Sequence, residues 1–125
     1  MTDQKLGHGS YAIVLELEYM GLKCAGKRIH ELLLEHGDAS YIVRRFEEEC
    51  NLLSQVHHPN IVQFLGVYFQ QRVPTPILVM EFLPTNLTFC IQLYSILPNE
   101  ISCPILHDVA VGLCYLHSQN PPIIH

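Results

Sequence analysis

The sequence has 125 residues, of which 49% are hydrophobic and 15% charged, a globular composition that suffices for one modest core. Its formal net charge of -5 argues against a nucleic-acid partner, because little excess basic charge is present to displace counterions from a phosphate backbone. No apolar run approaches the roughly 18 residues of a membrane helix, and the first residues contain no apolar signal-peptide core.

The five cysteines are odd in number, scattered along the chain, and form no C-x-x-C pair. This pattern predicts reduced thiols in a cytoplasmic protein rather than a disulfide framework. His57 and His58 are adjacent, so their side chains point in different directions, and no third ligand follows at metal-site spacing. We therefore predict no metal site among these residues.

The first predicted feature is a β-hairpin formed by residues 4–9 and 12–19 around a glycine-rich turn. Glycines in such a turn let the backbone approach a polyphosphate and offer its N–H groups as donors. An ordinary hairpin turn is the alternative explanation, because G-x-G occurs in many hairpins.

The stretch 22–29 (LKCAGKRI) predicts a third strand. With a two-residue period, Ala25, Lys27 and Ile29 share one face, so a charged amine lies among small and apolar neighbours. Such a charge needs a partner or a ligand. Gly26 points to the other face and weakens the strand locally.

A candidate partner for Lys27 lies in the helix predicted from about residue 40 to 56. Glu49 falls inside the apolar stripe of this helix, whose other members are Ile42, Phe46 and Leu53. Two opposite charges therefore occupy inward faces of neighbouring elements. The alternative is that Glu49 is a solvated glutamate and that Lys27 reaches solvent along its own stem.

The remaining elements follow from apolar runs and turn residues. The link 31–37 is expected to contain a helical turn at most. Two strands are predicted at 61–69 and 76–82, a short helical segment at 87–97, and a helix from about 101 to 118 that Pro98 introduces.

Five motifs in order resemble those of a protein kinase domain. LGHGSYAIV is similar to G-x-G-x-x-G-x-V, and CAGK to V-A-I-K. HPNIVQFLGV resembles the segment after the kinase αC helix, PILVMEFLPTNL the fifth strand and hinge, and CYLH with PPIIH the run Y-L-H…I-I-H-R-D. The residue pattern HPNIVQFLG resembles most closely the one found in kinases of the tyrosine-kinase-like group.

The resemblance implies an α+β fold. Residues 1–83 would form the kinase small lobe and hinge, with a five-stranded antiparallel sheet and the αC helix. Residues 84–125 would begin the helical large lobe with the αD and αE helices, ending at the histidine of H-R-D, so that the lobe is truncated.

The resemblance also assigns roles to individual residues. Lys27 would contact the α- and β-phosphates of ATP, with Glu49 holding it in place. The residues expected to bind the nucleotide are Gly7, Gly9 and Ala12 in the glycine-rich loop, Val14 and Ala25 around the adenine ring, Lys27, the gatekeeper Met80, and the hinge residues Glu81 and Leu83. Leu53 and Phe64 match two members of the hydrophobic spine between the lobes.

The activity implied is transfer of the ATP γ-phosphoryl group to a serine, threonine or tyrosine hydroxyl of a protein substrate. The family's catalytic aspartate and its Mg²⁺ ligands would lie beyond His125, so these 125 residues alone are expected to be an inactive fragment. Two alternatives stay open. Ala12 and Gly26 depart from the family pattern and suit a nucleotide-binding pseudokinase; a non-catalytic short isoform would act as a scaffold.

Overall fold

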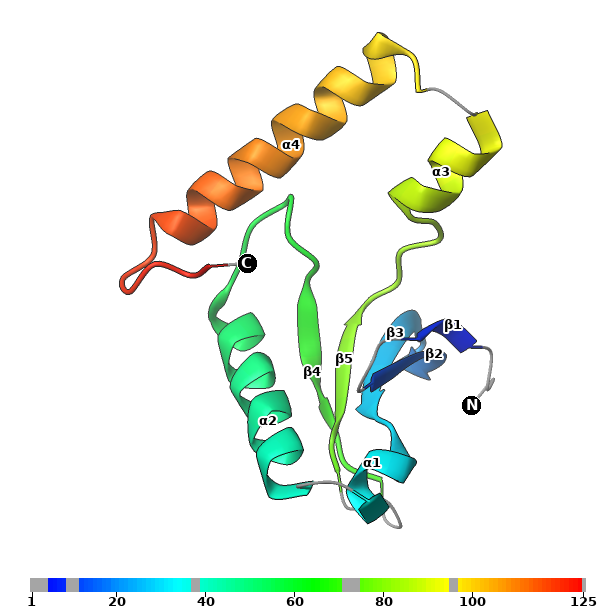
Figure 1. Ribbon diagram of the computed structural model, residues 1–125, viewed down its shortest axis with the longest axis vertical. Helices are drawn as coiled ribbons and strands as arrows, with labels where there is room; N and C mark the ends of the chain where they lie inside the picture. Colours follow the sequence, from blue (N-terminus) through cyan, green and yellow to red (C-terminus); the bar gives the residue numbers. More distant parts are fainter. Residues whose placement is uncertain (1–4, 9–11, 37–38, 71–74, 95–96, 125) are drawn as a thin grey trace. The chain divides into compact units, whose positions relative to one another are not determined.

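The computed structural model describes residues 5–8, 12–36, 39–70, 75–94 and 97–124 (Figure 1). The chain divides into two compact units. The sheet unit comprises residues 1–56 and 63–82, and the helical unit comprises residues 57–62 and 83–125.

The sheet unit contains five strands in the order β1-β2-β3-β5-β4, and all neighbouring pairs are antiparallel. The predicted five-stranded antiparallel sheet is therefore confirmed. The strands are β1 (Lys5–His8), β2 (Ala12–Tyr19), β3 (Leu22–Ile29), β4 (Phe64–Tyr68) and β5 (Ile77–Glu81). The residues between β1 and β2, where the glycine-rich turn is predicted, lie outside the described part.

β4 begins three residues later than the apolar run at 61–69 suggested. The Ile61 N–H donates to the His58 carbonyl at 3.0 Å, which closes a turn just after Pro59. This turn belongs to the helical unit, so the strand starts only once the chain has left it.

Two helices follow β3 in the sheet unit, α1 (Glu31–His36) and α2 (Ala39–Gln55). The expectation of a helical turn at most at 31–37 is wrong, because α1 contains six residues. A helix this short is not stable alone. Leu34 is packed against the core of the sheet unit, and Arg28 forms an ion pair with Glu31 in its first turn at 2.9 Å.

The register places alternate residues of the strands on two faces of the sheet. The inner face, which α2 covers, carries Lys27; its core consists of Ile29, Phe46, Cys50 and Leu78. The outer face carries Gly26; its core consists of Leu17, Cys24, Ile77 and Val79. Gly26 and Lys27 therefore lie on opposite faces of the sheet.

The helical unit contains α3 (Leu87–Tyr94) and α4 (Asn99–His117), and Pro98 stands directly before α4, as predicted. The turn at 57–62 is held against α4. The Asn60 side-chain amide donates to the Asp108 carbonyl at 2.9 Å, and the His57 N–H donates to the Tyr115 hydroxyl at 3.2 Å. Gly112 leaves room for this contact, because a Cβ there would lie 3.3 Å from the Asn60 carbonyl oxygen.

None of the helices in the described ranges combines the length and the apolar character needed to cross a membrane.

Candidate functional site

Lys27 and Glu49 form an ion pair in the sheet unit. The Lys27 Nζ donates to the Glu49 Oε1 at 2.6 Å, and the two side chains are only 20% and 28% exposed. β3 directs the lysine to the inner face, and the helical stripe that includes Phe46 directs the glutamate to the same place. A pair that is partly open to solvent adds little to folding stability, so its main effect is to fix the position of the amine.

The neighbours of Lys27 across the sheet form one row. Gly7 of β1 is opposite Val14 of β2, Val14 is opposite Lys27, and Lys27 is opposite Leu78 of β5. This row brings a glycine, a valine and the lysine, all predicted site residues, into register across four strands. Gly9 lies outside the described residues.

Small and apolar side chains surround the lysine on the inner face. Ala25 is 8% exposed and is opposite Met80, so both share the inner face with Lys27. Ala12 is 3% exposed and is opposite Ile29 at the other end of β3. The Lys27 amine thus has small and apolar side chains as its neighbours at this end of the inner face, while the charged pair of Lys23 and Glu16 lies further along the same face.

Leu53 and Phe64, the predicted spine residues, both pack against the core that contains Phe46. Met80 packs there too. These contacts link α2, β4 and β5 beside the ion pair. These contacts are ordinary core packing. The same three side chains can also form the wall of a ligand site.

The end of β5 is fixed by two bonds to Gln63. The Glu81 N–H donates to the Gln63 carbonyl at 3.0 Å, and the Gln63 N–H donates to the Glu81 carboxylate at 2.7 Å. Glu81 is therefore held by both its backbone and its side chain. Leu83, the other predicted hinge contact, belongs to the helical unit, and its side chain is 58% exposed.

One cluster near this end was missed by the sequence reasoning. The Lys23 ammonium lies 3.0 Å from the Glu16 carboxylate and 4.2 Å from the centroid of the Phe82 ring. It joins β2, β3 and the residue after β5 through an ion pair and a cation–π contact. The sequence contained part of the information, because the two-residue period of the strand places Lys23 on the same face as Ala25 and Lys27.

Cys50 lies next to Glu49 on α2 and belongs to the inner core. Burial is the main cause that raises the pKa of the Cys50 thiol to about 11, and the negative charge of Glu49 raises it further, while Lys27 opposes this effect. The thiol therefore stays protonated at neutral pH and acts as a small apolar side chain.

The ligands for a metal ion are not assembled in the described part of the chain. Its histidine, cysteine, aspartate and glutamate side chains form no group of three that could hold a cation. These residues do not fit the Mg²⁺ that protein kinases use. The Lys27 amine, in contrast, is a charged donor of the kind that can bind a phosphate group.

The comparisons with known proteins agree with this geometry. The sequence pattern of the family described as the protein kinase domain matches residues 1–125. The serine/threonine-protein kinase CTR1 of Arabidopsis thaliana is 31% identical over 126 residues, which cover 98% of this chain and 15% of the relative. The probable serine/threonine-protein kinase drkB of Dictyostelium discoideum is 32% identical over 128 residues, which cover 97% of this chain and 17% of the relative.

The chain thus spans a small part of the length of these relatives, 15% and 17%. Within that part, the match extends over the glycine-rich strand pair, the lysine strand, the glutamate helix and the first helices of the second unit. As a family, protein kinases bind ATP and Mg²⁺ and transfer a phosphoryl group to proteins. This chain belongs to the protein kinase domain family.

Proposed function

We propose that these residues are the ATP-binding part of a protein kinase of the tyrosine-kinase-like group. The observation that carries the proposal is the ion pair of Lys27 and Glu49, 2.6 Å long, beside a row that contains Gly7 and Val14. In the complete domain, the reaction would be transfer of the ATP γ-phosphoryl group to a protein hydroxyl. The serine/threonine kinases among the relatives favour serine or threonine as the acceptor.

Each proposed site residue has a distinct role. Lys27 would neutralise charge on the α- and β-phosphates of ATP, and Glu49 would hold the amine in the position where it contacts those phosphates. Val14, Ala25 and Met80 would line the adenine pocket, the backbone of Glu81 and Leu83 would bond the adenine edge, and Gly7, Gly9 and Ala12 would cover the phosphates.

The proposed division places residues 1–83 in the small lobe and hinge, and residues 84–125 at the start of the large lobe. Mg²⁺ would be held by residues that are not among these 125. The free thiols of Cys24, Cys50, Cys90, Cys103 and Cys114 support a reducing compartment, the cytoplasm.

A pseudokinase that binds nucleotide without transferring phosphate is the second candidate, because Ala12 and Gly26 depart from the family pattern. The position of Gly26 weakens the part of this argument that rests on that residue. Gly26 lies on the outer face, opposite Leu15 of β2 and Val79 of β5, and leaves the Lys27 face unchanged. Ala12 is small and buried, so it adds little bulk to the loop.

Binding of labelled ATP by equilibrium dialysis tests the proposal. Lys27→Met should weaken ATP binding at least about tenfold, as expected when a charged hydrogen-bond donor is lost. Arg44→Met is the matched control, because it removes one positive charge at a side chain that is 79% exposed and pairs with Glu48 on the surface of α2. Equal affinities of the two variants would contradict the proposal.

Phosphotransfer is a separate readout. The 125-residue polypeptide should give only background labelling with ATP, Mg²⁺ and generic protein substrates, because it has no residue in the place of the family's catalytic aspartate. Robust labelling that disappears in Lys27→Met would show that this expectation is wrong.

A further inference from the structure

Lys23 lies at the end of the sheet where the backbone proposed to bind adenine begins. The register of β3 and β5 ends with Cys24 opposite Glu81, so Lys23 and Phe82 are the next residues along the two strands. Their side chains meet beyond the end of the ladder, with the Lys23 Nζ 4.2 Å from the centroid of the Phe82 ring. A cation–π contact thus continues the pairing of β3 and β5 by one residue.

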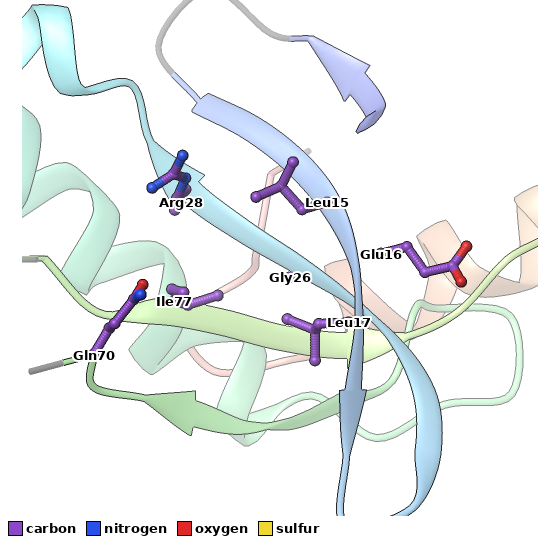
Figure 2. A pocket seen from close by; sticks show the side chains of 7 residues that line it. All are labelled: Leu15, Glu16, Leu17, Gly26, Arg28, Gln70 and Ile77. Carbon is purple, nitrogen blue, oxygen red and sulfur yellow. The ribbon is translucent and has the colours of Figure 1, made fainter. Parts of the chain in front are cut away.

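A carboxylate of β2 holds the Lys23 ammonium in this place. The Nζ lies 3.0 Å from the Glu16 carboxylate, and the Glu16 side chain is only 16% exposed. In Figure 2, which shows a pocket on the outer face, Glu16 extends to the other side of β2 from Leu15 and Leu17. Glu16 therefore projects to the inner face, where Lys23 also lies, and it ties the ammonium to the sheet.

The end of β5 is thus held from both sides. On the β4 side, the Glu81 N–H donates to the Gln63 carbonyl at 3.0 Å; on the β3 side, Lys23 holds the ring of Phe82. Phe82 is partly buried and belongs to the sheet unit, so all of these contacts lie within one unit. The peptide unit that joins Glu81 to Phe82, which is proposed to face the adenine edge, is therefore fixed at both of its residues.

Lys23 is too far from Lys27 to act on the phosphates directly. The two lysines are four residues apart on β3, which corresponds to about 13 Å at a rise of about 3.3 Å per residue. This distance exceeds the Debye length of about 8 Å at physiological ionic strength, so the Lys23 charge is largely screened where Lys27 lies. An effect of Lys23 on the nucleotide should therefore concern the base and not the phosphates.

We propose that Lys23 is a positioning residue for adenine binding. It holds the Phe82 ring and, through it, the peptide unit that contains the Glu81 carbonyl. This inference rests on the proposed function, ATP binding, and it adds a residue that lies outside the glycine-rich loop, the Lys27–Glu49 pair and the hinge.

The experiment measures the affinity of the 125-residue chain for labelled ATP, adenosine and inorganic triphosphate by equilibrium dialysis at physiological ionic strength. Lys23→Met removes the cation and keeps an unbranched side chain. It should weaken the binding of ATP and of adenosine by the same factor, about two- to fivefold, which is the effect expected from the loss of one cation–π contact. Triphosphate, which has no base, should bind to Lys23→Met as tightly as to the unchanged chain.

Further variants identify the contact that is responsible. Lys23→Arg keeps a cation over the ring and should bind all three probes as the unchanged chain does. Phe82→Leu removes the ring and keeps an apolar side chain, so it should lose as much adenosine affinity as Lys23→Met. The double variant should lose no more than either single variant, because the two residues share one contact. Lys27→Met should show the opposite pattern, with weaker binding of ATP and triphosphate and unchanged binding of adenosine.

Three results would overturn the inference: unchanged adenosine affinity of Lys23→Met, an equal loss for triphosphate, or strictly additive losses of Lys23→Met and Phe82→Leu. The second result would indicate a general effect on charge or folding, and the third would mean that Lys23 does not act through the ring. Failure of the proposed function looks different, because the unchanged chain would then bind neither ATP nor adenosine, or Lys27→Met would leave ATP affinity unchanged.

Discussion

The sheet unit and the helical unit differ in how far their apolar side chains are buried. Of the buried apolar side chains that the structure describes, all except Leu116 belong to the sheet unit. In the helical unit, large apolar residues of both helices stay exposed, among them Phe89 at 55%, Leu93 at 62%, Leu106 at 67% and Val109 at 53%.

This difference shows which unit buries its apolar side chains by itself. The sheet unit forms two small cores, one on each face of the sheet, and its own packing can hold Lys27 and Glu49 in place. The helical unit has apolar surface that its own residues do not cover, and exposed apolar surface of this kind favours contact with further protein. The proposed ATP chemistry is thus concentrated in the unit whose interior is complete.

The largest effect should come from the core of the sheet unit. Phe46→Ala should lower the free energy of unfolding by about 3–5 kcal/mol, because Phe46 is 0% exposed and its removal leaves a cavity between α2 and the sheet. Leu106→Ala, at a residue of α4 that is 67% exposed, should change it by about 0.5 kcal/mol or less. Urea unfolding followed by circular dichroism measures both, and equal losses would remove the distinction between the units.

A smaller effect is expected on the outer face. Gly26→Val should destabilise the sheet unit by about 1–3 kcal/mol, because its Cβ would overlap Leu17 Cδ2. Leu17→Ala in the same chain should relieve part of this loss, so the two changes are not additive. Unfolding midpoints of both single variants and the double variant provide the test; simple additivity would mean that Leu17 and Gly26 do not share the space.

The cysteines distinguish the units through their reactivity. Cys103 and Cys114 of the helical unit are exposed, while Cys24 and Cys50 of the sheet unit are buried. At pH 8, N-ethylmaleimide should modify Cys50 at least about tenfold more slowly than Cys103, because only the thiolate reacts.

The pH dependence has a definite sign. Burial first and the Glu49 charge second raise the Cys50 pKa to about 11, so the folded protein should keep this thiol protonated until the pH approaches that value. Mass spectrometry of digested samples gives the rates. Modification of native Cys50 as fast as Cys103 would show that the inner core opens readily.

Much of the site could be predicted because it depends on local periodicity. β3 spans residues 22–29 as the apolar pattern indicated, and the alternation of its side chains placed Lys27 inward. The stripe of α2 placed Glu49 on the same side, and the pair is formed. The i,i+4 pair of Arg44 and Glu48 also follows from helical spacing, and its atoms lie 3.2 Å apart.

The features that the sequence did not predict depend on contacts between distant residues. α1 is stabilised where Leu34 packs on the inner core, and local propensity carries no information about that contact. The ammonium of Lys23 contacts the ring of Phe82, which is 59 residues further along the chain.

The most direct test of the central claim is a double-mutant cycle on ATP affinity. Lys27→Met should weaken ATP binding at least about tenfold, and Glu49→Gln should weaken it to a lesser extent, because the amine loses its position but keeps its charge. Adenosine, which has no phosphates, should bind equally to all variants. The double variant should bind ATP about as weakly as Lys27→Met alone, because the two residues act as one unit. Strictly additive losses, or equal losses for adenosine, would contradict the account that Glu49 holds Lys27 for the phosphates.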